Sequence, residues 1–136
     1  LVLFDPSKAR QMHYLRKRSA QLFSKSRFIA AQFDAYFRDG LWLDLARHSN
    51  AMAGRLAEGF AASGKGRLAW PTGSNELFAI LRNDALKALR EKGATFYDWH
   101  PGPDLQATMQ DDETLIRLVT SFATTQADVD GFLSAL

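Results

Sequence analysis

The sequence predicts an α/β protein whose main part is a small α+β domain, a single sheet with helices packed against it. Three observations predict this class. A long amphipathic helical pattern covers residues 41–62, short strand-like apolar segments follow Gly66, and two capped helical patterns lie between and after those segments. With 136 residues, of which 46% are hydrophobic and 24% charged, the chain fits one domain or a small domain with an appendage.

The first part of the chain is predicted to form a strand followed by basic helices. The strand is LVLF, residues 1–4. Asp5 followed by Pro6 predicts a helix start, with Asp5 as N-cap and the helix continuing to about residue 24. A second helical stretch follows, and an Asp-Gly pair at 39–40 interrupts it.

Beyond this point the predicted order is helix, strand, strand, helix, strand, strand, helix. The long first helix ends at the flexible sequence SGKG. Strands are predicted at residues 67–70, 76–81, 95–99 and 114–122. Asn83 is expected to cap the middle helix and Gly93 to end it, while PGPD forms a turn. The last helix begins at Thr125, whose spacing to Asp128 resembles a capping box.

Two domains are expected, residues 1–40 and residues 41–136, with the boundary inside residues 24–42. Charge is unevenly divided between them. Residues 1–28 hold seven basic side chains and one acid, whereas the rest of the chain holds 10 basic and 14 acidic ones. The basic opening suits phosphates, an acidic protein surface or solvent. Because the chain enters an apolar strand directly at Leu1, we interpret it as a fragment of a longer protein.

Composition excludes several classes of site. The chain has no cysteine, which excludes a disulfide framework and cysteine-based metal sites or nucleophiles and fits a reducing compartment. No apolar run approaches the roughly 18 residues of a membrane helix. None of His13, His48 and His100 has a second ligand at metal-binding spacing, so no metal site is predicted. Gly-rich phosphate loops and the G-x-S-x-G motif are also missing.

The densest basic segment is LRKRSAQLFSKSRF, residues 15–28. One interpretation is a solvated helix face, since basic runs usually face water. The alternative is phosphate binding by Lys25 and Arg27 at a break between helices. Nucleic acid is less favoured, because no exposed aromatic stacking platform is evident.

Arg117 stands within the apolar strand TLIRLVTSF. Alternation places it on one face with Leu115 and Val119, and puts Ile116 and Leu118 on the other. A buried guanidinium without a partner costs several kcal/mol. Two interpretations follow. Arg117 forms an internal ion pair, for example with Asp98, or lies at the sheet margin; or it projects into a cleft and binds a substrate carboxylate.

The stretches LRKRSAQLFSKSRFIAAQ, LWLDLARHSNAMAGRLAEGF and IRLVTSFATT, with the closing ADVDGFLSAL, resemble the carboxy-terminal part of low-specificity threonine aldolases. The resemblance runs in order across nearly the whole chain. It implies a pyridoxal-phosphate (PLP) enzyme of the aspartate-aminotransferase fold. Residues 1–40 would then be the tail end of the large PLP-binding domain and residues 41–136 the small carboxy-terminal domain.

The resemblance also implies residue roles. Arg27 matches an arginine that reaches the cofactor phosphate, in its own or an adjacent subunit, and Arg117 matches the arginine that holds the substrate α-carboxylate. Relatives carry a polar amide shortly before that arginine, where this chain reads DDET, residues 111–114. LVLFDPSKARQMHYLRKR resembles the strand and helix that follow the Schiff-base lysine. That catalytic lysine is therefore expected upstream, and no catalytic residue is assigned here.

The implied function is cleavage of L-threonine and other β-hydroxy-α-amino acids to glycine and an aldehyde, by a cytoplasmic homodimer or homotetramer. The isolated chain is expected to be inactive. Two alternatives stay open at this point. One is a non-catalytic α+β binding module whose basic segment meets nucleic acid or an acidic partner, and the other is a different PLP-dependent lyase.

Overall fold

The computed structural model describes residues 4–136, and the chain divides into two compact units, Leu1–Leu41 and Trp42–Leu136. The predicted strand at 1–4 lies outside the described residues except for Phe4, which is an exposed bend residue. No helix in the described part is long and apolar enough to cross a membrane.

The first unit consists of short helices. These are η1 (Pro6–Ala9), α1 (Met12–Arg18), α2 (Ser26–Phe37) and η2 (Arg38–Gly40). The predicted N-cap is confirmed, because the Asp5 side chain accepts a hydrogen bond from the Ser7 amide at 3.0 Å. The predicted interruption is confirmed as well, since Asp39 adopts a φ of 54°.

The prediction of one helix to about residue 24 is wrong. The helix α1 ends at Arg18, and Ala20 adopts a left-handed φ of 55°. The basic residues Arg16, Lys17 and Arg18 form its last turn. Cations are favoured there because they face the negative end of the helix dipole. These three basic residues in a row therefore indicate where the helix α1 ends.

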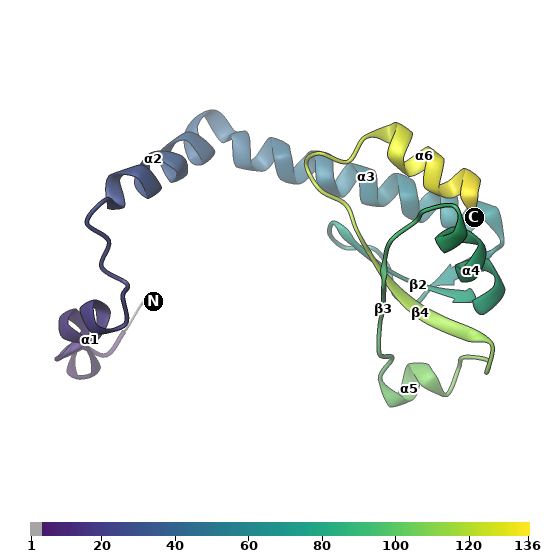
Figure 1. Cartoon of the computed structure of the whole chain (residues 1–136), viewed down its shortest axis with the longest axis horizontal. Coiled ribbons are helices and arrows are strands. Elements are labelled where there is room, and N and C mark those ends of the chain that lie inside the picture. The colour runs from purple at the N-terminus through teal and green to yellow at the C-terminus, as the bar shows by residue number, and fades with distance from the viewer. Residues whose placement is uncertain (1–3) are drawn as a thin grey trace. The chain divides into compact units, whose positions relative to one another are not determined.

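The second unit contains a four-stranded antiparallel sheet with strand order β1-β2-β4-β3 (Figure 1). Its strands are β1 (Gly66–Leu68), β2 (Glu76–Arg82), β3 (Tyr97–Asp98) and β4 (Glu113–Val119). The remaining helices are α3 (Leu41–Ser63), α4 (Asn83–Glu91), α5 (Pro103–Gln106) and α6 (Gln126–Ala135). The predicted fold class is confirmed, and the predicted elements occur in the predicted order, with the short helix α5 added between β3 and β4.

The core lies between one face of the sheet and three helices. It is built from buried side chains of α3, α4 and α6 and of strands β2 and β4: Met52, Ala53, Leu56, Phe60, Leu77, Ala79, Leu81, Leu86, Leu89, Ile116, Leu118 and Val129. Burying this many apolar side chains is the main stabilising contribution in such a domain. The long helix ends as predicted, with Gly64 at a φ of +63° that disfavours other residues.

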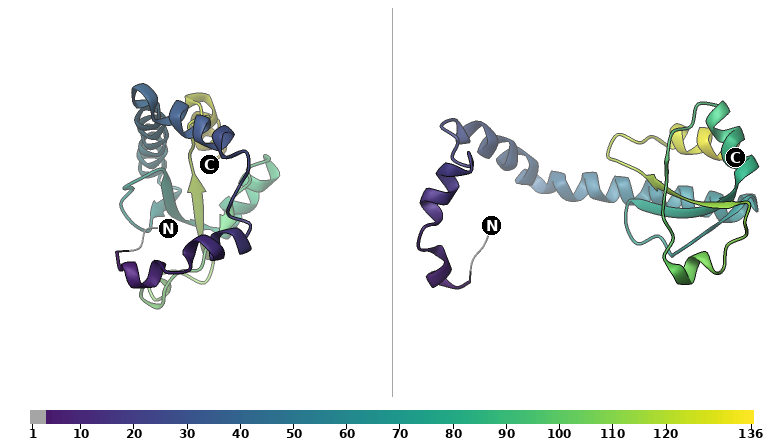
Figure 2. Two further views of the ribbon diagram at one scale, coloured as in Figure 1. Left: turned by 90° about the vertical axis from the view of Figure 1, so that its left-hand side faces the viewer. Right: turned by 60° about the horizontal axis from the view of Figure 1, so that its bottom comes forward.

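The predicted alternation along β4 is confirmed. Ile116 and Leu118 belong to the helix-packed core. Leu115 and Arg117 lie on the opposite face, and Leu115 is also fully buried. Figures 1 and 2 show α5 on the side of the sheet away from α6. The loop that carries α5 contacts this second face, where Arg67 donates a hydrogen bond to the Thr108 carbonyl at 3.4 Å.

Several element boundaries differ from the prediction. The strands β1, β3 and β4 are displaced or shorter, and PGPD contributes to the one-turn helix α5 with Pro103 at its start. The middle helix begins at Asn83 itself, so Asn83 is not its cap. The Asn83 side chain instead accepts a hydrogen bond from the Thr114 hydroxyl at 2.7 Å, a partner far away in sequence.

Candidate functional site

Arg117 lies at the centre of the sheet on the face opposite the helices. It pairs in register with Phe78 on β2 and with Tyr97 on β3, so strands flank it on both sides. Its side chain is 30% exposed. The guanidinium is therefore neither sealed in the core nor fully solvated, and a dissolved ligand can reach part of it.

The guanidinium has two close neighbours. Its Nη2 donates a hydrogen bond to Glu76 Oε1 and forms an ion pair with it, and its Cζ lies 5.2 Å from the centroid of the Trp99 ring. Nε is buried and meets no acceptor among the described residues. An arginine held between a carboxylate and an aromatic ring has little freedom to turn, because the ring covers one of its faces.

The suggested partner Asp98 is wrong. Asp98 pairs in register with Ile116, whose side chain faces the helices, so the Asp98 side chain lies on the other face from Arg117. There it forms an ion pair with Arg90 of α4 at 2.5 Å. Glu76 lies diagonally across from Arg117 on the same face, which explains why it is the partner.

An aromatic row supports the site. Trp99 packs edge-on against Phe78 with ring centroids 5.6 Å apart, and Phe78 packs in the same way against Trp70 at 5.2 Å. Trp99 also extends the pairing of β3, since its amide donates to the Leu115 carbonyl at 2.8 Å. Sequence reasoning missed Glu76 and the whole row. The local signal was the predicted strand at residues 76–81, which puts Glu76 and Phe78 on the same face.

A hollow of about 520 Å³ adjoins the edge of β4. Its lining comes from β4, the segment before β3, α3 and the first turns of α6: Leu56, Thr95, Phe96, Tyr97, Arg117, Leu118, Val119, Thr120, Thr124, Asp128, Val129 and Phe132. Arg117 is the cation among these residues. The acid, Asp128, is engaged by Thr125, whose amide and hydroxyl donate to it at 2.8 and 2.7 Å and lower its pKa.

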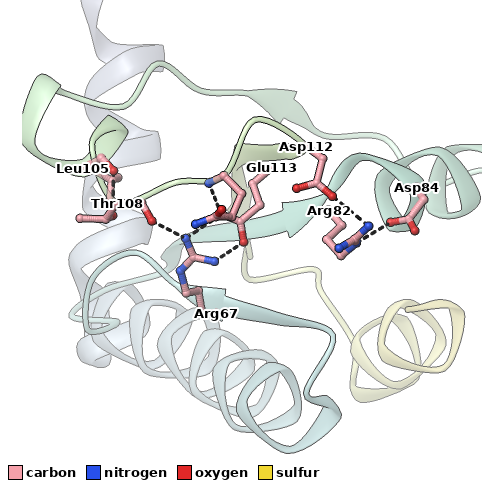
Figure 3. A network of polar contacts seen from close by, with 8 residues as sticks. Arg67, Arg82, Asp84, Leu105, Thr108, Asp112 and Glu113 are labelled. Carbon is pink, nitrogen blue, oxygen red and sulfur yellow. Dashed lines mark hydrogen bonds and ion pairs between the residues drawn. The ribbon is translucent and has the colours of Figure 1, made fainter.

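A second polar cluster fixes the other end of the same sheet face (Figure 3). Arg67 forms a two-pronged ion pair with Glu113, one contact being 2.8 Å, and Glu113 also accepts from the Gln110 amide at 2.9 Å. The hydrogen bond from Arg67, followed by that amide, lowers the pKa of Glu113 to about 2. Asp112 pairs with Arg82 at 2.8 Å. Two of the acids in DDET, Asp112 and Glu113, are thus each paired with an arginine of this chain.

Arg27 lies in the first turn of α2, in the first unit, and is exposed. Its Cζ is 5.0 Å from the Phe28 ring centroid. The residue before the helix, Lys25, makes no side-chain cap. An uncapped helix start carries amide donors and the positive end of the dipole, and here Lys25 and Arg27 add two cations. These residues fit a phosphate group.

Comparisons with known proteins agree with the resemblance seen in the sequence. No protein-family model matches the chain. Over 97 residues it is 36% identical to the low-specificity L-threonine aldolase of Pseudomonas aeruginosa and 35% identical to that of another Pseudomonas strain. Each match covers 71% of this chain and 28% of the relative, so the chain spans less than a third of the length of these relatives.

Solved structures give the same result. A threonine aldolase structure from Leishmania major matches with a TM-score of 0.78 and 33% identity, over 92% of this chain and 34% of that one. A serine palmitoyltransferase from Sphingomonas wittichii matches with a TM-score of 0.50 and 21% identity, over 65% of this chain, which supports the fold alone. The predicted resemblance is thereby confirmed, and the alternative of a nucleic-acid-binding module is not favoured.

Proposed function

We propose that this chain, a homologue of the low-specificity L-threonine aldolases, is the carboxy-terminal part of a PLP-dependent lyase that cleaves L-threonine and related β-hydroxy-α-amino acids to glycine and an aldehyde. The similarity in sequence and fold supports the family. The observation that carries the assignment to chemistry is Arg117, whose 30% exposed side chain places its guanidinium between Glu76 and Trp99, and which is also one of the residues that line the hollow.

Arg117 binds the α-carboxylate of the amino acid. Its planar fork can donate two parallel hydrogen bonds, which fix both the position and the rotation of a carboxylate. The neighbouring strands and the Trp99 ring hold the guanidinium in place before the substrate binds. Binding therefore loses little conformational entropy of the Arg117 side chain, and the bound amino acid is oriented. The orientation determines which bond at Cα is presented for cleavage.

Arg27 and the start of α2 hold the cofactor phosphate in this proposal. When bound, PLP supplies an electron sink that stabilises the charge left on Cα. The contribution of this chain is an anion site made from the amide groups of an uncapped helix and two basic side chains. We also propose that the complete protein is a cytoplasmic homo-oligomer, in line with the cysteine-free composition and the Arg27 role.

The first prediction tests Arg117 in the complete protein. Arg117→Ala and Arg117→Lys should lower kcat/KM for L-threonine by roughly 30- to 1000-fold, because each lost charge-assisted hydrogen bond contributes about 1.5–3 kcal/mol. Lysine should recover little, since it lacks the planar fork. Steady-state kinetics measure the effect, with Arg82→Lys at the other end of the same sheet face as the matched control. Unchanged threonine kinetics in the Arg117 variants would contradict the assignment.

The second prediction tests Arg27. Arg27→Ala should weaken PLP retention by about tenfold, because one charge-assisted phosphate contact is lost. The measurement is the PLP absorbance that remains after dialysis against increasing volumes of buffer. Arg18→Ala, which removes an exposed cation from the neighbouring helix, serves as the control and should retain PLP like the unmodified protein. Equal retention in Arg27→Ala would exclude the phosphate role.

A further inference from the structure

We propose that Glu76 is a specificity-determining residue of the Arg117 site. It acts as an internal carboxylate that holds the guanidinium when no ligand is bound, weakens the binding of a single carboxylate, and discriminates against amino acids that carry a second one. The inference rests on the proposed function for its substrate class. Its geometric basis is the Arg117–Glu76 ion pair, which the structure contains independently of that function.

The guanidinium has two edges that could meet a carboxylate in a two-pronged manner. The edge formed by Nε and Nη2 is closed, because Nε is buried with no acceptor in the described part of the chain. The remaining edge is formed by Nη1 and Nη2, and Nη2 already donates to Glu76 Oε1. An incoming carboxylate must therefore share Nη2 with Glu76 or take it from Glu76. In both cases two carboxylates meet at one guanidinium.

The pair cannot easily separate. Trp99 covers a face of the guanidinium with its ring centroid 5.2 Å from Cζ, and Trp99 is itself packed against Phe78. The Arg117 and Glu76 side chains are 30% and 35% exposed, so their charges are only partly screened by water. Glu76 therefore stays beside the ligand instead of swinging into solvent.

The other charged groups nearby do not offset Glu76. On the same face Glu113 is held by Arg67, and on the opposite face Asp98 is held by Arg90. The Arg117–Glu76 pair is close to neutral as a unit. One ligand carboxylate gives this unit a net charge of −1, and a second ligand carboxylate adds to that excess. Like charges a few ångströms apart repel more strongly beside a protein than in bulk water.

Glu76→Gln in the complete, PLP-loaded protein tests the inference, because glutamine keeps the shape and an acceptor oxygen but removes the charge. KM for L-threonine should fall by about threefold to tenfold. L-aspartate and L-asparagine, which have the same shape and differ in charge, serve as competitive inhibitors. The inhibition constant of aspartate should fall by about tenfold more than that of asparagine. Glu76→Asp, which keeps the charge, should keep the original ratio.

Glu91→Gln is the matched control, because it removes the same charge from an exposed ion pair on α4 and should change none of these constants. A second readout needs no catalysis. The thermal midpoint should rise with sodium formate, relative to sodium chloride at equal ionic strength, at lower concentrations in Glu76→Gln than in the unmodified protein.

The outcomes separate the two proposals. If the unmodified protein does not cleave threonine, the proposed function fails, and the formate comparison still decides the role of Glu76. An unchanged or raised KM, or equal gains for aspartate and asparagine, would overturn the inference. So would an identical formate response in Glu76→Gln and the unmodified protein.

Discussion

Glu113 illustrates how the surroundings of one residue set its chemistry. Its side chain is only 11% exposed and receives two contacts from Arg67, which reaches it from β1 across the intervening strand. These contacts favour the carboxylate and hold the pKa of Glu113 at about 2, below its ordinary value of 4.5. A pKa lowered by folding means that the ionised pair stabilises the folded state.

The pH dependence of stability follows from this shift. The contribution of Glu113 should be complete above the unfolded pKa near 4.5 and should disappear as the pH falls toward 2. Glu113→Gln should therefore lower the unfolding free energy by about 2 kcal/mol at pH 7 and by little at pH 2. This figure is smaller than the pKa shift alone implies, because water screens the charge of the half-exposed Arg67. Urea unfolding followed by circular dichroism across this range measures it, with Glu91→Gln as control. A difference that does not change with pH would contradict the pairing.

At the scale of elements, α6 shows which structures a local pattern determines. The Thr125 hydroxyl accepts from the Asp128 amide at 3.1 Å, while Asp128 accepts from the Thr125 amide at 2.8 Å. Both partners lie within four residues, so the sequence alone identifies the box. The strand β3 is the opposite case. Five residues have strand character, but only Tyr97 and Asp98 are in register with residues of β4, and one further hydrogen bond joins the Trp99 amide to the Leu115 carbonyl. Pairing with a distant segment decided its length.

The capping box gives the element-scale prediction. Thr125→Ala removes the side-chain acceptor at the start of α6 and should lower the unfolding free energy by about 1 kcal/mol, the usual contribution of an N-cap. Ser134→Ala is the control, because Ser134 lies near the end of the same helix and its hydroxyl donates a hydrogen bond back to the Asp130 carbonyl at 2.7 Å. Denaturant unfolding compares the two. Equal stability of the variants would show that the box does not stabilise the helix.

At the scale of the whole molecule, the two units differ in whether each contains a buried hydrophobic core. The helices of the first unit contain no buried residue among the described ones, although α2 carries large apolar side chains such as Ile29, Phe33 and Tyr36, which are exposed. The second unit has a continuous core. The local signals, namely helical periodicity, caps and glycine stops, predicted the order of helices and strands in the second unit apart from α5, but they did not predict the break after Arg18 in the first. They could not predict strand register, which brings together residues far apart in the chain.

The same division applies to the candidate site. The charge of Arg117 in an apolar strand was visible in the sequence, and so was its face of the sheet. Its partner was not, because Glu76 precedes it by 41 positions and only the pairing of β2 with β4 places the two side chains together. Asp98 was a plausible ion-pair partner because it lies on the strand next to β4, but its side chain is on the opposite face of the sheet from Arg117. The aromatic row was missed for the same reason.

The register of β4 limits how this chain can vary. The strand presents Arg117 to one face and Ile116 to the other, and it is paired on both sides at these two positions. A substitution elsewhere in β4 changes one contact. Deletion or insertion of a single residue within the strand would turn the guanidinium into the helix-packed core and an isoleucine toward Glu76. Related sequences should therefore vary in the composition of this segment while keeping its length.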